Sequence, residues 1–263
     1  MPLNCKLAAA TVSFVLLLLF RAFPLATKPL PNLSADEAAR LHSVRTFEIL
    51  PALTEPVFDE FVALTARIFS LPISLISVVE EDDVYYPANL GMPGNDQQPR
   101  AEALCSTAIA LSRAVVYHDL ALESSPAIPP AALQAAEHNH LRFYAGALLR
   151  LPDQRPLGTL CVIDREPRVF SPDEQRILEL LAALVSRTIA VRHLCRLHPK
   201  TGEAKWAQLS SELQEEVQAF NALVRYLFAR HGTQVPVPSS FLTQVESRIR
   251  DLQGLLDDYH PQS

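Results

Sequence analysis

The fold is decided by one continuous stretch of sequence: RFYAGALLR at residues 142–150, LPDQRP at 151–156 and LGTLCVID at 157–164. The two outer runs are apolar and contain strand-favouring residues, while the segment between them is polar and has Pro-Asp near its start, as turns do. The stretch therefore predicts a β-hairpin. The sequence SPDE at 171–174 follows, and its capping hydroxyl, its proline at the first helical position and its acids predict a long helix over about 172–197.

Upstream of the hairpin, helical and strand patterns alternate. Apolar residues at three-and-four spacing predict helices, and short runs of apolar β-branched residues predict strands. Pro87, directly after the residues that begin the second upstream strand, indicates an edge strand. We expect helices at 34–49, 56–70 and 102–111, strands at 73–79, 84–86 and 114–117, and loops at 91–99, 118–130 and 135–141.

Together, these segments resemble the GAF domain, a regulatory sensor module, and in particular a bacterial subgroup of stand-alone GAF sensors. The likeness covers about residues 31–192. It is carried by the hairpin and by LHSVR at 41–45, FD at 58–59, LPISLISVV at 71–79 and LCSTAI at 104–109. The resemblance implies an α+β fold with a GAF-like central antiparallel sheet flanked by helices. It does not by itself imply a function, because one scaffold carries many activities.

Beyond a turn at residues 198–202, apolar residues recur at three-and-four spacing from Trp206 to Leu227 and again from Leu242 to Leu256. This pattern predicts a C-terminal helical pair. A single apolar seam cannot bury itself alone, so the pair either folds back on the domain as a hairpin or forms a coiled coil with a second chain. The expected organisation is an N-terminal segment and linker at 1–30, a GAF domain at 31–197 and the helical pair at 203–263.

The N-terminal segment contains an apolar run from Leu7 to Phe20, which is shorter than the roughly 20 residues of a membrane-spanning helix. Extending the run across Arg21 gives a marginal span from Leu7 to Ala26. Three interpretations stay open: a membrane anchor that leaves the GAF domain in the cytoplasm, a signal peptide, and an extension created by a wrongly assigned start site.

Composition and charge exclude several classes of function. The 263-residue chain has a net charge of -6 and no run of basic residues, so we expect no nucleic-acid partner. Its four cysteines are far apart, which argues against both a zinc site and a disulfide framework. Glu137, His138 and His140 are not at the paired spacing of metal ligands, and we expect no metal.

Cys105 is the one candidate for catalysis, because it precedes a helix start whose dipole would stabilise a thiolate. It resembles one cysteine of the free methionine-R-sulfoxide reductases, which are GAF enzymes with a further cysteine in the loop before the central strand. That loop, at 135–141, has no cysteine here. Because bilin-binding GAF domains attach their chromophore through a cysteine in the same loop, we also expect no covalent bilin. The cofactor, if any, is unknown.

The sequence therefore favours a non-enzymatic sensor that binds an unidentified small molecule and relays its presence to the C-terminal helices, to a second copy in a homodimer or to a signalling partner protein. The alternatives are a thiol-based redox enzyme of the methionine sulfoxide reductase type and a helical dimerisation scaffold. Arg142 is expected to select an anion. The expected ligand-binding residues are Tyr85, Cys105, Arg142, Tyr144 and Cys161.

Overall fold

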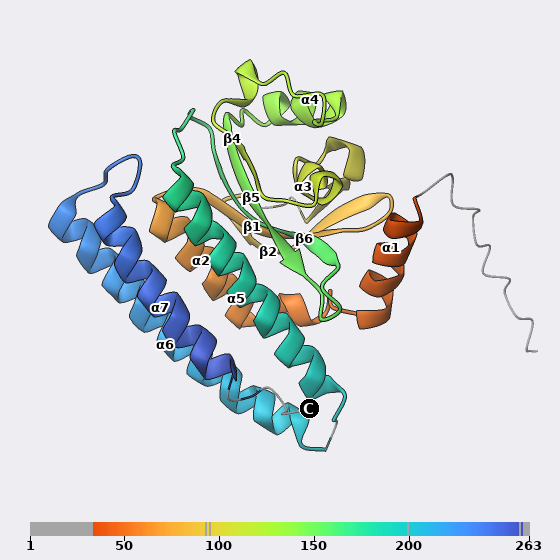
Figure 1. Cartoon of the computed structure of the whole chain (residues 1–263), viewed down its shortest axis with the longest axis vertical. Coiled ribbons are helices and arrows are strands. Elements are labelled where there is room, and N and C mark those ends of the chain that lie inside the picture. Colours follow the sequence, from red (N-terminus) through yellow and green to blue (C-terminus); the bar gives the residue numbers. More distant parts are fainter. Residues whose placement is uncertain (1–33, 93, 95, 199, 258, 260–263) are drawn as a thin grey trace, which may run out of the picture. The chain divides into compact units, whose positions relative to one another are not determined.

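The computed structural model describes residues 34–257 and 259, apart from 93, 95 and 199 (Figure 1). The apolar N-terminal segment, and with it the anchor, signal-peptide and start-site interpretations, lies outside these residues. None of the described helices combines the length and the hydropathy needed to cross a membrane.

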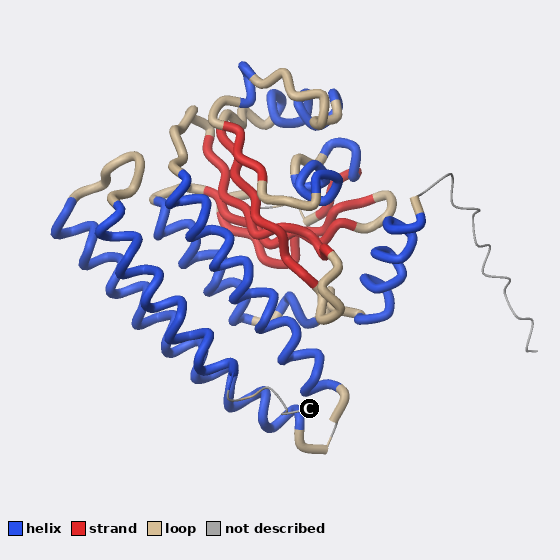
Figure 2. The backbone as a smooth tube through the Cα atoms, viewed as in Figure 1, coloured by secondary structure: helices blue, strands red, loops and turns tan. Residues whose placement is uncertain are grey.

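The centre of the fold is a six-stranded sheet with the order β3-β2-β1-β6-β5-β4, in which every neighbouring pair is antiparallel (Figure 2). This is the sheet that the GAF resemblance implies. The strands are β1 (Ile73–Val79), β2 (Asp83–Leu90), β3 (Gln97–Pro99), β4 (Val115–Tyr117), β5 (Phe143–Arg150) and β6 (Pro156–Asp164).

Strands β5 and β6 confirm the predicted hairpin, with Tyr144 opposite Ile163 and Leu149 opposite Gly158. Strand β6 also pairs with β1, which places the hairpin at the middle of the sheet. Gly158 is required at this contact, because a Cβ there would lie 1.8 Å from the carbonyl oxygen of Ser77. Both strands are almost fully buried, which explains their near-continuous apolar sequences.

Helices cover both faces of the sheet (Figure 1). On one face lie α2 (Pro56–Phe69) and α5 (Pro172–Arg196), and on the other lie α3 (Cys105–Leu111) and α4 (Pro130–His138), while α1 (Ala35–Phe47) flanks the sheet. Helix α5 begins with the predicted cap: the Ser171 side chain accepts a hydrogen bond from the Glu174 backbone N–H, and the Glu174 carboxylate accepts one from the Ser171 N–H.

The C-terminal helices α6 (Gly202–His231) and α7 (Ser239–Asp257) form an outer layer, with α6 against α2 and α7 against α5 (Figure 1). Their seams are buried in the same apolar core as α2 and α5, including Trp206, Val224 and Ile249. The structure thus places the pair as an intramolecular hairpin, and residues 35–263 form one compact unit.

All three expected loops contain regular structure, and the one at 118–130 includes a short 3-10 helix, η3 (Leu120–Leu122). The segment 91–99 includes β3, which pairs with β2 only from Asp83 to Tyr85. Its sequence lacks the apolar alternation typical of strands, because β3 is held by backbone hydrogen bonds to β2. The expected loop at 135–141 overlaps α4, which starts with a proline in its first turn and contains several alanines, the best helix formers. Strand β2 also continues past Pro87, because β3 no longer pairs with it there.

Candidate functional site

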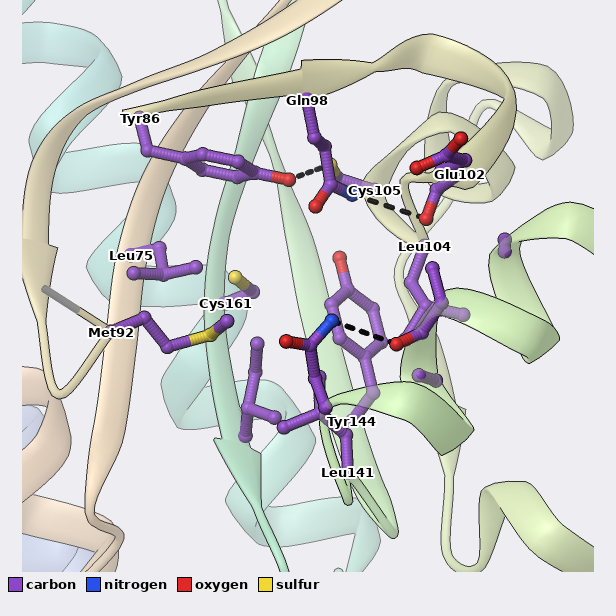
Figure 3. A pocket seen from close by; sticks show the side chains of 15 residues that line it. Leu75, Tyr86, Met92, Gln98, Glu102, Leu104, Cys105, Leu141, Tyr144 and Cys161 are labelled. Carbon is purple, nitrogen blue, oxygen red and sulfur yellow. Dashed lines mark hydrogen bonds between the residues drawn. The ribbon is translucent and has the colours of Figure 1, made fainter. Parts of the chain in front are cut away.

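A cavity lies between the sheet and the helices α3 and α4 (Figure 3). Strands β1, β2, β5 and β6 supply its floor, and the start of α3, one side of α4 and the segment after β2 cover it. Its lining is mostly apolar and aromatic, as is usual for small-molecule sites. The lining side chains labelled in Figure 3 are Leu75, Tyr86, Met92, Gln98, Glu102, Leu104, Cys105, Leu141, Tyr144 and Cys161.

Hydroxyl and thiol groups form a buried polar cluster on the cavity side of the sheet. The Tyr86 hydroxyl lies 3.9 Å from the Cys105 sulfur, and the Tyr144 hydroxyl lies 3.4 Å from Thr159 Oγ1. Thr159 Oγ1 in turn lies 3.0 Å from the hydroxyl of Ser77. Tyr86, Cys105 and Tyr144 line the cavity and can orient a ligand by hydrogen bonding, whereas Thr159 and Ser77 lie outside the lining and contact the Tyr144 hydroxyl or one another.

The position of Tyr144 depends on a glycine two residues further along β5. A Cβ at Gly146 would lie 2.5 Å from the Tyr144 hydroxyl oxygen and 2.9 Å from Cζ. Those separations are far below van der Waals contact, so the ring must move if residue 146 carries a side chain. Because Gly146 has no side chain, it leaves the space that the Tyr144 ring occupies in the cavity lining.

Burial keeps the thiol and phenol groups of the cavity neutral. Desolvation raises the pKa of the Cys105 thiol, although hydrogen bonds from Ser77 and Tyr86 act in the opposite direction. It likewise raises the pKa of Cys161, Tyr86 and Tyr144. The thiol-based alternative gains no support from this environment: Cys105 does begin α3, but burial acts against the charged form of its thiol. The site is equipped for hydrogen bonding rather than for nucleophilic attack.

The cavity is small in this conformation. Its volume open to water-sized spheres is about 30 Å³, enough for a few water molecules at most, whereas small-molecule sites have ~300–1,000 Å³. The cover consists partly of small side chains of α4, including the buried Ala132 and Ala136. A ligand larger than a few atoms must displace α4 or the segment that carries Met92.

The structure brings together three of the five expected ligand-binding residues: Cys105, Tyr144 and Cys161 all line the cavity. Tyr85 does not, because alternate residues of β2 point to opposite faces; its partly buried ring packs on the core at the α2 side. Its neighbour Tyr86 takes the expected place. The alternation of strand residues between two faces predicts that only one of Tyr85 and Tyr86 can point into the cavity. The sequence does not determine which of the two does so.

Arg142 also lies outside the cavity lining. Its guanidinium makes a two-pronged ion pair with Asp119, with Nε and one terminal nitrogen 2.8 and 2.7 Å from the two carboxylate oxygens. This contact holds the pKa of the Asp119 carboxyl below its ordinary value. The expectation that Arg142 selects an anion inside the cavity therefore lacks a geometric basis. Ser77 and Thr159 were missed, because nothing in their sequence context separates them from ordinary strand residues.

In the described part of the chain, no group of three or more His, Cys, Asp or Glu side chains is arranged to hold a metal ion. Glu137, His138 and His140 are exposed around the end of α4.

Comparisons with known proteins agree with this architecture. The sequence model of the GAF domain matches residues 54–189, which is more than half of the chain. The chain is 31% identical over 201 residues to the cyclic di-GMP phosphodiesterase PA2567 of Pseudomonas aeruginosa, a match that covers 76% of this chain but 33% of that protein. The chain thus spans about a third of the length of the curated relative it matches.

Similar solved structures include the PixJ GAF domain of Thermosynechococcus elongatus, with a TM-score of 0.47, 15% identity and coverage of 58% of this chain and 94% of that one. Another is the free methionine-R-sulfoxide reductase of Neisseria meningitidis, with a TM-score of 0.42, 17% identity and coverage of 59% and 91%. The match of the family model to residues 54–189 decides the assignment: the chain belongs to the GAF domain family.

Proposed function

We propose that this protein is a non-enzymatic sensor whose GAF domain binds a small, uncharged organic molecule in the cavity under α3 and α4. The observation that carries this proposal is the lining itself, in which neutral hydroxyl and thiol groups such as those of Tyr86 and Cys105 border apolar side chains. Among the described lining residues, none is a lysine, arginine or histidine, and the one charged side chain is that of Glu102. An anionic ligand would have no positive charge to meet in such a cavity.

Strand β5 provides a physical route from the cavity to the helices. Its residues alternate, so that Tyr144 lines the cavity while Phe143 and Ala145 belong to the core on the opposite face, which includes α5. Helix α5 in turn packs against α7. A ligand that shifts the floor of the cavity therefore acts on the surface on which α5 and the C-terminal helices rest, and it changes the balance between two packings of these helices.

A buried ion pair ties the same helices together at the start of α5. Glu174 lies 2.6 Å from a guanidinium nitrogen of Arg168, and the same carboxylate oxygen accepts a hydrogen bond of 3.1 Å from the backbone N–H of Val237, in the connection between α6 and α7. A movement of the first turn of α5 would therefore displace or break the hydrogen bond to this connection. The signal is then a change in the packing of α6 and α7, which a partner protein or a second copy of the chain recognises by binding.

The alternatives have weaker support. A thiol-based redox enzyme needs an accessible thiolate, whereas burial raises the pKa of the Cys105 thiol. The phosphodiesterase activity in the name of the Pseudomonas relative belongs to a protein three times the length of the matched part. A scaffold that dimerises through the seams of α6 and α7 must first expose Trp206, Ile249 and their neighbours, which are buried within this chain.

The test is to measure the mass of the full chain, purified from its native host, under non-denaturing and then denaturing conditions. The proposal predicts a co-purifying organic molecule that is released on denaturation. Tyr144→Phe removes one hydroxyl from the cavity and should lower the occupancy several-fold, since a lost hydrogen bond costs about 1 kcal/mol. Tyr226→Phe is the matched control, because Tyr226 is exposed on α6, and it should retain full occupancy.

A second measurement addresses the relay. Light scattering and amide hydrogen exchange are recorded with the released molecule added back to the emptied protein. Slower or faster exchange in α7, or a changed oligomeric state, supports signalling. Binding that leaves exchange in α5, α6 and α7 and the oligomeric state unchanged would refute the relay, and a protein that never carries a small molecule would refute the sensor.

A further inference from the structure

A second cavity, of about 670 Å³, lies beyond the point where β4 stops covering β5. The end of β5 and the turn after it form one wall, the solvent-facing side of α5 forms another, and Gln253 of α7 closes one side. It shares no lining residue with the cavity under α4. Its volume falls within the ~300–1,000 Å³ of small-molecule sites.

Three arginines from different elements line this cavity: Arg113 before β4, Arg150 at the end of β5 and Arg187 on α5. In the described part of the chain, no carboxylate lies within ion-pair distance of Arg113 or Arg150. Their guanidinium groups contact backbone oxygens of Ala114 and Gln154, at 3.5 and 3.0 Å. Most of their donors are therefore available to a ligand.

Arg187 adds a buried donor. It pairs with Asp257, near the end of α7, through one terminal nitrogen. Its Nε is buried and makes no hydrogen bond to any described residue. A buried N–H without a partner is unfavourable, so a small movement of the Arg187 side chain that brings Nε to an acceptor on a ligand would be stabilising. Three guanidinium groups around one cavity contrast with the net charge of -6 of the whole chain.

We propose that this cavity binds a small organic molecule carrying an oxyanion group, either a carboxylate or a phosphate. The guanidinium fork matches both groups in geometry and charge. Leu148, Leu151 and Leu194 supply apolar surface for the organic part of the molecule. Glu179 is the one acid in the lining, where it accepts a hydrogen bond from Gln175, and its charge opposes an anion.

Occupancy has a structural consequence, because the cavity joins elements that are far apart in sequence. A molecule held by Arg150 and Arg187 would lie against Gln253 and thereby connect the sheet to the last turns of α7. Binding should slow amide exchange in those turns. This site is independent of the proposed sensor cavity, since a chain that binds nothing under α4 still presents the arginines.

The test is calorimetric titration of the full chain with citrate and, separately, with pyrophosphate, each against sodium chloride of equal ionic strength. We expect saturable binding of at least one probe: citrate alone identifies a carboxylate ligand, and pyrophosphate alone identifies a phosphate. Arg150→Gln should weaken binding about tenfold or more, since a hydrogen bond to a charged group contributes ~1.5–3 kcal/mol. Glu179→Gln should tighten it several-fold by removing the opposing charge.

Arg225→Gln is the matched control, because Arg225 is an exposed arginine of α6 outside this cavity, and it should bind both probes like the unmodified protein. The proposal is overturned if neither probe saturates the protein. It is also overturned if Arg150→Gln and Arg225→Gln lose affinity equally, because the binding is then general attraction to surface charge. None of these outcomes depends on the molecule in the first cavity.

Discussion

Replacing Glu174 with glutamine should destabilise the protein by about 3–5 kcal/mol, the usual cost of leaving one partner of a buried ion pair without its counter-charge. The side chain of Glu174 is fully buried and that of its partner Arg168 is 5% exposed. Glutamine keeps one oxygen, which can accept the hydrogen bond from the Ser171 N–H in the position of Oε2. The helix cap is then retained, while the charge and the acceptor of the Val237 N–H at the other oxygen are lost together.

The contacts around Arg168 show why the cost should be high. One terminal nitrogen of its guanidinium donates to the carbonyl of Phe69, and its Nε makes no hydrogen bond among the described residues. With Glu174 neutral, a full positive charge stays buried with only the carbonyl of Phe69 and the face of the Phe170 ring to stabilise it among the described residues. For a unit of this size, each kcal/mol corresponds to ~2–4 °C, so the midpoint of thermal unfolding should fall by roughly 6–20 °C.

Urea unfolding followed by circular dichroism measures the effect on the free energy of unfolding. The double variant Arg168→Met with Glu174→Gln removes both charges and should recover much of the loss. Glu216→Gln, in the exposed pair with Arg248, should cost less than about 1 kcal/mol. If Glu174→Gln costs no more than this control, or if the double variant is less stable than Glu174→Gln alone, the buried charge is not what holds the start of α5.

Three further predictions concern the cavity and the helical layer. Gly146→Ala should cost about 1–3 kcal/mol of stability and displace the ring of Tyr144, because its Cβ would overlap that ring; unchanged urea unfolding would contradict the packing described. Burial raises the folded-state pKa of Cys105 and Cys161, so the unfolded chain loses these two protons at a lower pH than the folded chain. The free energy of unfolding should therefore fall above about pH 9, by up to ~1.4 kcal/mol per pH unit for each thiol. Urea unfolding at a series of pH values measures this slope, and a variant with both cysteines replaced by alanine should lack the contribution of the two thiols. A chain ending at Leu197 should aggregate or unfold well below the full chain's midpoint, because it exposes the apolar faces of α2 and α5 that α6 and α7 cover; a stable monomer in light scattering would instead establish 31–197 as an independent domain.

The parts of the fold that sequence patterns predicted correctly depend on local signals. The β5–β6 hairpin follows from two apolar runs around a polar turn, and the start of α5 follows from Ser171 and Glu174, whose reciprocal hydrogen bonds form within four residues. Strand β3 was missed for the opposite reason. Gln97–Pro99 has almost no pattern of its own, and β3 exists because β2 offers backbone partners.

The cavity was harder to predict because it depends on which face each side chain takes. Tyr85 and Tyr86 have the same chemistry and adjacent positions, and only the register of β2 against β1 places one of them in the cavity. That register shifts between Ile76 and Val78, close to the two tyrosines, and no local pattern reveals such a shift. Arg142 was misplaced because its partner Asp119 lies 23 positions away in the chain, on a connection whose path the sequence does not determine.

The apolar seams of the C-terminal helices have two interpretations, and the packing of helix α2 distinguishes between them. The seams of α6 and α7 fit a self-associating coil as well as an intramolecular hairpin. Helix α2, however, carries apolar side chains around most of its circumference, among them Phe58, Val62 and Phe69, all buried. A helix that rests on a sheet with one face needs a second layer for the other, and α6 supplies it. Helices α6 and α7 are therefore part of the core, and a single helix, α5, lies between β5 and α7.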